Sequence, residues 1–350
     1  MDIPAQVLTR KAIVLACAYC LIAFATVVAV IHFSLPDRLK LYADMRSEKI
    51  ALMESSQACS AAFGSSHIHY GFDPRAFDAT LDNTMATHTI NLGVGGGSQV
   101  EQRVLAMKFA RKLDAHSAQN CFLLLELDAG VNFNFRFLVH PRTINVYDAD
   151  AVRFVKSLTP LSLGLRRVVG RMGYALLASV MYYSNTGMES NRIFPPDLNA
   201  QAIQDESRND RRGLLTPIEP LSKLDQVRRE LTSTEPLHKE VFILPQGVPQ
   251  LADEIASQAH VPNLHIAYVV FPRAHDVSSQ SEFPDSIPTR CGVVPIFNMA
   301  QPAKYPDIYV VQNWADDAHL SEAGASITSR HLAEQLNAWF TVHPQPMECH

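Results

Sequence analysis

The chain has 350 residues, of which 47% are hydrophobic and 19% are charged, so it is long enough to form one large domain or two smaller ones around a substantial core. Its formal net charge at pH 7 is −5, which argues against the basic surface that nucleic-acid-binding proteins present to phosphates. We therefore expect no nucleic acid among its partners.

The first element is an uncharged apolar segment, AIVLACAYCLIAFATVVAVIHF, at residues 12–33. At about 1.5 Å per residue, such a helix crosses a bilayer core of about 30 Å. It is longer than the 7–15 apolar residues typical of a cleavable signal, and no clear small-residue cleavage site follows it. We predict a cytoplasmic tail and an uncleaved signal anchor over residues 1–34, with a buried core helix as the alternative.

Arg10 and Lys11 precede this segment, and the preference for positive charge on the cytoplasmic side places the N-terminus in the cytoplasm. The sequence thus predicts a single-pass protein of the cell inner membrane whose main domain is periplasmic or extracellular. Residues 35–57, where apolar side chains approach helical spacing, are predicted to form a helical stalk.

Beyond residue 57 the pattern changes to short apolar runs that end in Gly, Asp, Pro or polar residues, as buried parallel strands do. Helical patterns at residues 98–116 and 247–259 alternate with these runs, and another helix is expected to begin near Ser321. This alternation predicts a three-layer α/β/α sandwich with a central parallel sheet. The runs are ACSAAFG at 58–64, TINLGV at 89–94, CFLLLELD at 121–128, LHIAYVVF at 264–271 and DIYVVQ at 307–312.

The domain is predicted in two halves, residues 58–150 and 237–341, followed by a tail at 342–350. The intervening residues 151–236 are predicted to be an insertion or cap. Its apolar part, residues 161–183, is interrupted by three arginines, which argues against a second transmembrane pass because each central arginine costs about 2.5–3.5 kcal/mol on insertion. A cap over the active site and a helix at the membrane interface remain alternatives for it, and residues 187–236 have the composition of a solvated loop region.

Six cysteines are present, and two of them, Cys17 and Cys20, lie inside the apolar segment. The other four allow three pairings. A bridge between Cys59 and Cys121 is one alternative in an oxidising compartment. Buried free thiols are the interpretation that we favour from the sequence.

Polar and glycine-rich blocks follow the predicted strands, at the carboxyl edge where ligands bind in sheets of this kind. Taken singly, each block has an ordinary interpretation as a turn, a tight connection or a helix cap. Their order along the chain favours a joint site. The blocks are Gly64-Ser65-Ser66, the stretch from Asn91 to Gly97, Asp128-Ala129-Gly130-Val131-Asn132 and Asp316-Asp317-Ala318-His319.

Residues 58–140 and 262–340 resemble the SGNH (GDSL-type) hydrolase superfamily, which implies an SGNH-type, flavodoxin-like arrangement of the sheet. The last block, within DDAHLSEAGA, matches the family both in its Asp-x-x-His pair and in the Ser-x-x-Gly that follows. The resemblance implies that Ser66 is the nucleophile, with Ser65 in place of the usual Asp and shaping the turn. Asp316 and His319 complete the implied triad.

The same resemblance implies an oxyanion hole formed by the backbone N–H groups of Ser66 and Gly96 together with the amide of Asn132. The third block departs from the family pattern Gly-x-Asn-Asp, because Asn132 is followed by Phe133. Asn134 is the rival donor.

These residue types fit acyl transfer. A serine hydroxyl becomes nucleophilic when a base within hydrogen-bonding reach takes its proton, and His319 is the candidate base. Asp316, three residues earlier, can reach the other ring nitrogen and hold the imidazole in its working tautomer. Fixed N–H donors then stabilise the tetrahedral intermediate, and each is typically worth about 10²–10³ in rate.

The anchor, the glycine-rich block and the stretch GSSHIHYGFDP resemble membrane-anchored accessory proteins that O-acetylate exopolysaccharides such as alginate or help to load D-alanine onto teichoic acid. This resemblance implies an acyltransferase or esterase, most often for acetyl groups, acting on an envelope polysaccharide. The implied partners are that glycan and a multi-pass membrane protein that supplies the acyl group. The alternative is a catalytically silent, anchored glycan-binding or scaffold protein, which the altered third block favours.

We expect neither a metal nor another cofactor. His67 and His69 flank the nucleophile, but no carboxylate stands at metal-ligand spacing with them, and the chain has no His-Glu-x-x-His motif. The stretch NLGVGGGS lacks the Gly-Lys-Ser/Thr ending of a phosphate-binding loop and only approximates the dinucleotide-binding spacing.

Overall fold

A computed structural model describes residues 10–34, 40–81, 88–113, 120–127, 149–157, 159, 161–183, 212–214, 221–244, 247–259, 261–347 and 349. Its centre is a six-stranded sheet with the strand order β2-β1-β3-β5-β8-β7. Every neighbouring pair in this sheet is parallel except β7 with β8. The strands are β1 (Ser60–Phe63), β2 (Thr89–Asn91), β3 (Cys121–Glu126), β5 (Leu264–Val270), β7 (Ser286–Thr289) and β8 (Gly292–Asn298).

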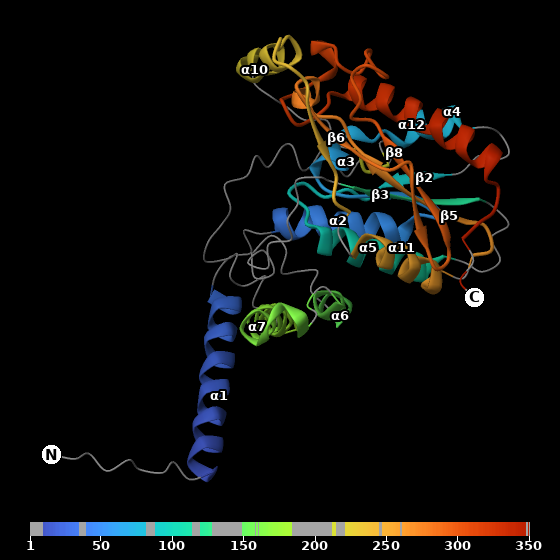
Figure 1. Ribbon diagram of the computed structural model, residues 1–350. Coiled ribbons are helices and arrows are strands. Elements are labelled where there is room, and N and C mark those ends of the chain that lie inside the picture. Colours follow the sequence, from blue (N-terminus) through green and yellow to red (C-terminus); the bar gives the residue numbers. More distant parts are fainter. Residues whose placement is uncertain are drawn as a thin grey trace.

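Helices cover both faces of this sheet, which confirms the predicted α/β class with a central, mostly parallel sheet (Figure 1). One face carries α3 (Ser66–Gly71), α4 (Pro74–Thr80) and α12 (Glu322–Val342). The other carries α2 (Lys40–Ser55), α5 (Gln99–Lys112) and α11 (Gly247–Gln258). The helices predicted at 98–116, at 247–259 and after Ser321 correspond to α5, α11 and α12.

The alternation of side chains along each strand divides the core between the two faces. In β1, Ala61 and Phe63 face α5, whereas Ala62 faces α12. In β3, Leu123 packs with the first group and Phe122 with the second. Each fully buried side chain of phenylalanine or leucine size contributes about 1.5–3 kcal/mol, so both faces of the sheet hold its helices.

The sheet lacks one predicted strand and contains two strands, β7 and β8, that were not predicted. Residues 307–312 do not form a strand but a series of turns that leads into the 3₁₀ helix η7 (Val311–Asn313). Their backbone is held by a local bond instead of a ladder, because the carbonyl oxygen of Ile308 accepts a hydrogen bond from the indole N–H of Trp314, six residues later, at 3.1 Å. The place next to β5 is occupied by β8. The sequence did not reveal β8 because Pro295 interrupts its apolar run, and proline is unusual inside a strand.

The prediction of free thiols outside the apolar segment is also wrong. Cys59 and Cys121 form a disulfide, and Cys291 forms another with Cys349. Because β1 and β3 are parallel neighbours with Ala61 opposite Leu123, the residues two positions earlier face each other, with a Cα–Cα distance of 5.1 Å. The pairing therefore depends on strand register, which the sequence alone does not give.

The apolar segment at 12–33 forms α1 (Arg10–Ser34). Residues Ala12–Val30 are long and apolar enough to cross a membrane and are not buried in the protein. By length and composition this helix fits both a membrane anchor and a signal sequence. In the predicted stalk, α2 is helical, and its end packs against the sheet through the buried Met53.

The predicted insertion contributes α6 (Ala149–Ser157), the 3₁₀ helix η4 (Leu161–Leu163), α7 (Leu165–Tyr183) and α10 (Leu221–Leu231). The last of these corrects the prediction of a loop throughout 187–236, because α10 is a regular helix whose Val227 is buried. Residues 187–211 and 215–220 of that prediction lie outside the described residues. A separate pair of parallel strands, β4 (His238–Val241) and β6 (Ser279–Glu282), lies next to the 3₁₀ helix η6 (Ala274–Val277).

Candidate active site

The predicted nucleophile stands at the turn between β1 and α3, at the carboxyl edge of the sheet. Ser66 is the first residue of α3, and the side chain of Ser65 caps this helix by accepting a hydrogen bond from the N–H of His67. Gly64 follows directly after β1, at a position where neighbouring side chains leave no room for a Cβ atom. A Cβ atom at Gly64 would lie 2.3 Å from Oε2 of Glu126 and 2.4 Å from Cγ1 of Ile68, so only glycine fits without a shift of its neighbours.

His319 and Asp316 reach this turn from the loop between η7 and α12. His319 Nε2 lies 2.9 Å from the hydroxyl oxygen of Ser66, and its Nδ1 lies 2.8 Å from Oδ2 of Asp316. The serine and the histidine are 253 positions apart in the chain. The structure thus brings together all three residues of the predicted triad in the order nucleophile, base and carboxylate.

The loop holds the Asp316 carboxylate in place through its own backbone. The N–H groups of Ala318 and His319 both donate to Oδ1 of Asp316, each at 2.8 Å. Burial by itself raises the pKa of this carboxyl, but the hydrogen bonds and charge of His319 and the two backbone donors outweigh it, so the pKa lies below its usual value. Asp316 is therefore ionised at neutral pH and available to stabilise an imidazolium.

Lys223 of α10 lies with its Nζ 3.8 Å from Oδ2 of Asp316. On the same helix, Gln226 donates to the Asp317 carboxylate at 2.9 Å. A helix of the predicted insertion therefore contacts the triad loop directly. No motif in the sequence signals these contacts, since they depend on how α10 packs on η6 and η7.

The second predicted block lies against the nucleophile turn. The N–H of Val94 donates to the carbonyl oxygen of Gly64 at 3.0 Å. Gly96, the predicted oxyanion-hole residue, is exposed on this turn and has a φ of +64°, which glycine adopts without strain. Asn91, the first residue of the block, has a structural role, because its buried amide donates to the carbonyl oxygens of Ile68 and Phe72 at the end of α3.

The third predicted block, residues 128–132, begins just after Leu127, where this part of the described structure ends. Gly130, Asn132 and Asn134 lie outside the described residues, so their assignments stay predictions.

A carboxylate that the sequence analysis missed lies beside the nucleophile. Glu126, the last residue of β3, accepts hydrogen bonds from the backbone N–H of Ser65, from the Ser65 hydroxyl at 2.9 Å and from Nδ1 of His67 at 2.8 Å. Its side chain is only 5% exposed. Burial alone raises the pKa of this carboxyl, but His67 and the Ser65 donors outweigh burial and hold the pKa below its usual value.

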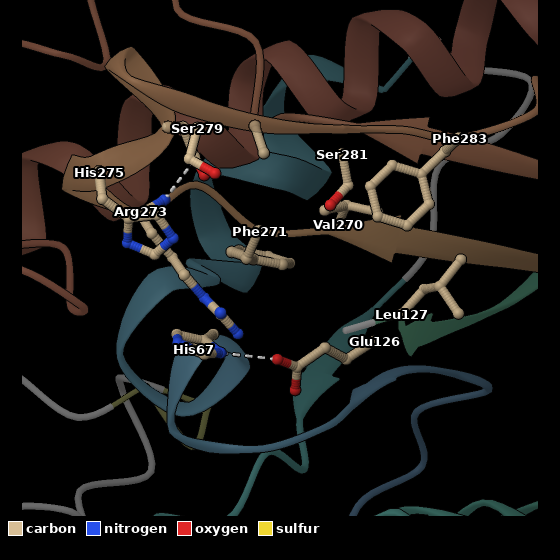
Figure 2. A pocket seen from close by; sticks show the side chains of 12 residues that line it. His67, Glu126, Leu127, Val270, Phe271, Arg273, His275, Ser279, Ser281 and Phe283 are labelled. Atoms are coloured by element: carbon tan, nitrogen blue, oxygen red, sulfur yellow. Dashed lines mark hydrogen bonds and ion pairs between the residues drawn. The ribbon is translucent and has the colours of Figure 1, made fainter. Parts of the chain in front are cut away.

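Glu126 stood inside an apolar run, CFLLLELD, and was therefore treated as part of a strand. Its position could have identified it, because Glu126 is the last residue of the strand next to β1, and ligand sites of parallel sheets lie at the carboxyl ends of the strands. Figure 2 shows His67 and Glu126 facing each other across their hydrogen bond, with the Arg273 side chain extending toward the pair.

A small hollow of about 70 Å³ opens beside the triad. The ring of His67, one of its lining residues, lies 5.9 Å from the ring of His319 between centroids. The walls are mostly polar or aromatic (Figure 2). They include His67, Glu126, Phe271, Arg273, His275, Ser279, Ser281 and Phe283.

In the described part of the chain, no three His, Cys, Asp or Glu side chains come together in a group that could hold a metal ion. His69, one of the two histidines that flank the serine, is buried, and its Nδ1 lies 3.0 Å from the carbonyl oxygen of Gly93. This hydrogen bond connects α3, to which His69 belongs, with the second block.

Comparison with known proteins found no matching family model and no significant match among curated proteins.

Proposed function

We propose that this protein is a membrane-anchored extracytoplasmic serine acyltransferase or esterase of the SGNH type. The observation that carries the proposal is the hydrogen-bonded series from Ser66 through His319 to Asp316, at distances of 2.9 and 2.8 Å. In this reaction His319 takes the Ser66 proton while the hydroxyl oxygen attacks an acyl carbonyl, and it then donates that proton to the leaving group. A second nucleophile then gives its proton to His319 and attacks the acyl-serine. The bond between Ser66 and the acyl group breaks, the acyl group leaves on the second nucleophile, and His319 returns the proton to Ser66.

The second nucleophile decides between the two activities. A sugar hydroxyl gives O-acylation and water gives hydrolysis, and both use the same three residues. The oxyanion of the intermediate would be stabilised by the N–H groups of Ser66 and Gly96 with an amide from the third block, Asn132 or its rival Asn134. No cofactor takes part in these steps.

The substrate that we propose is an envelope polysaccharide or exopolysaccharide, which gains an O-acetyl group in the transferase reaction and loses one in the esterase reaction. The hollow of about 70 Å³ is lined by His67, the chain neighbour of Ser66, and we take it as the place of the sugar ring. Its combination of hydrogen-bonding side chains with Phe271 and Phe283 is suited to a sugar ring, which has polar edges and apolar faces. A multi-pass membrane protein would supply the acyl group in the transferase reaction.

Two features support a location outside the cytoplasm. The uncharged α1 helix is suited to a single pass through the cell inner membrane. The two disulfides are of a kind that persists in oxidising compartments and is rare in the cytosol. We therefore place the main domain in the periplasm or outside the cell.

The test is covalent labelling of the purified full-length protein with a fluorophosphonate, followed by turnover of p-nitrophenyl acetate. We expect labelling of the native protein and its complete loss in Ser66→Ala, whereas Ser257→Ala, on α11 away from the site, should label normally. His319→Ala should lower turnover by several orders of magnitude without changing the melting temperature, because the serine loses its base. A native protein that neither labels nor turns over ester would favour the silent glycan-binding alternative.

A further inference from the structure

Helix α7 carries a row of large apolar side chains that face away from the protein. The members of this apolar row are four, seven, four and three residues apart, so they lie along one side of the helix. They are Leu165 (77% exposed), Val169 (61%), Leu176 (66%), Val180 (49%) and Tyr183 (68%). A row of this length is unusual on a soluble surface and indicates a site of interaction.

The opposite side of α7 already has a partner within the protein. Ala175 and Ala178 are buried, and they pack in one cluster with Phe154 of α6 and Val100 and Val104 of α5. This contact seats the helix on the domain and determines which side faces outward. The side of α7 that packs on the domain is therefore a different side from the apolar row.

The charge of α7 indicates what covers the row. Arg166, Arg167 and Arg171 lie in its first two turns, and residues 161–183 contain no aspartate or glutamate. An apolar side combined with arginines and no acidic residue is typical of helices that lie in the membrane interface, where guanidinium groups reach lipid phosphates while apolar side chains enter the acyl boundary.

The chain also keeps the domain close to a membrane if α1 is an anchor. Only residues 35–39 separate α1 from α2, and a fully extended link from Ser34 to Lys40 spans about 20 Å. The far end of α2 is already packed against the sheet through Met53. In Figure 1, α6 and α7 lie on the side of the sheet from which α1 extends.

We propose that α7 lies in the outer interface of the bilayer that α1 anchors, with the apolar row at the headgroup–acyl boundary and the arginine-rich first two turns close to the lipid headgroups. The domain is then attached to the membrane at two points, and its orientation above the surface is fixed. The inference depends on the α1 anchor and not on the chemistry at Ser66, so either can fail without the other.

The test places a tryptophan on the row in the full-length protein, as Leu176→Trp, reconstituted into vesicles of phosphatidylcholine with phosphatidylglycerol. The matched control is Val293→Trp on β8, a site that is 55% exposed and lies outside α7. With lipids brominated on their acyl chains, we expect at least twofold quenching of the added emission at position 176 and none at position 293. The native Trp314 and Trp339 provide the background to subtract.

Equal emission at positions 176 and 293, unquenched by brominated lipid, would overturn the proposal. A blue-shifted but unquenched tryptophan at position 176 would overturn it too, because a protein partner or a second copy would then cover the row. A separate experiment tests the role of the arginines. Replacing Arg166, Arg167 and Arg171 together by glutamine should reduce quenching in vesicles with phosphatidylglycerol but not in phosphatidylcholine alone, and an equal effect in both would contradict the role of the arginines.

Discussion

At the scale of single residues, the strand β3 was predicted, but the carboxylate that it places beside Ser66 was not. The SGNH pattern that this chain resembles has an aspartate where Ser65 stands. Here Glu126, from the end of β3, occupies the space next to that turn and accepts hydrogen bonds from both the backbone and the hydroxyl of Ser65. It holds the backbone of Ser65 and the side chain of His67, the two neighbours of Ser66 in the chain, so we regard it as a positioning residue.

Glu126 should make the stability of the protein sensitive to acid. Its folded-state pKa lies below the ordinary value of 4.5, so its ionised form stabilises the fold above about pH 4.5, and this stabilisation is lost as the pH falls through the lower folded value. Loss of its charged hydrogen bonds in Glu126→Gln should cost about 2–4 kcal/mol at pH 7. Urea unfolding at pH 7, 5 and 3 measures the difference between native protein and variant.

That difference should be largest at pH 7 and should shrink between pH 5 and pH 3. A difference that stays constant over this range would show that the carboxylate does not act through its charge. Asp253→Asn is a control for the general loss of a buried carboxylate, because this residue is remote from the site and contacts Cys291 and Arg290 instead.

The amide of the oxyanion hole is a second question at this scale. If Asn132 donates to the oxyanion, Asn132→Ala should lower kcat by about 10²-fold with little change in KM, because the interaction forms mainly in the transition state. Asn134→Ala should then have little effect. Steady-state kinetics with p-nitrophenyl acetate distinguish the two, and the reverse result would move the third block by two positions.

At the scale of elements, the two disulfides connect parts of the sheet that are distant in sequence. The Cys59–Cys121 bridge joins β1 to its neighbour β3, and the Cys291–Cys349 bridge joins the start of β8 to the C-terminal tail. A second tail contact supports the latter, because the N–H of Met347 donates to the carbonyl oxygen of Leu264 at 3.0 Å. The first bridge stabilises β1, the strand that precedes Ser66.

Replacing Cys59 and Cys121 together by serine should therefore lower the stability of the fold. For a separation of 62 residues, the loop-entropy estimate is about 4 kcal/mol. Urea unfolding of the double variant measures it, and the Cys17→Ser, Cys20→Ser double variant is the control because these thiols in α1 are unpaired. Equal stability of the two double variants would indicate that the bridge adds nothing to the fold.

At the scale of the whole molecule, the orientation of α1 in the membrane decides on which side of the membrane the candidate site lies. Alkaline phosphatase fused after residue 350 should be active if the proposed orientation holds, since Arg10 and Lys11 at the start of α1 favour a cytoplasmic N-terminus and a domain on the other side of the membrane. A β-galactosidase fusion at the same point should be inactive. The opposite pair of results would reverse the orientation, and release of the domain without α1 would identify that helix as a cleaved signal.

The sequence by itself determined the elements whose signals are local. The uncharged run of α1 and the apolar runs of β1, β3 and β5 depend on composition over a few residues, and the helical pattern at 98–116 corresponds to α5. Ser66, Asp316 and His319 could also be selected from the sequence as candidate site residues, because each stands in a short block at a strand end or before a helix.

Tertiary structure decided whatever depends on long-range pairing. The turns at 307–312 have the local composition of a strand, but they contact distant residues, with Tyr309 bonded to Asp276 and Asp307 to His331. In contrast, β8 forms despite Pro295. The same holds for the disulfides and for Glu126, whose partners follow from the register of β1 with β3. A sequence records the preferences of neighbouring residues, whereas register, burial and the approach of distant side chains arise only when the whole chain has packed.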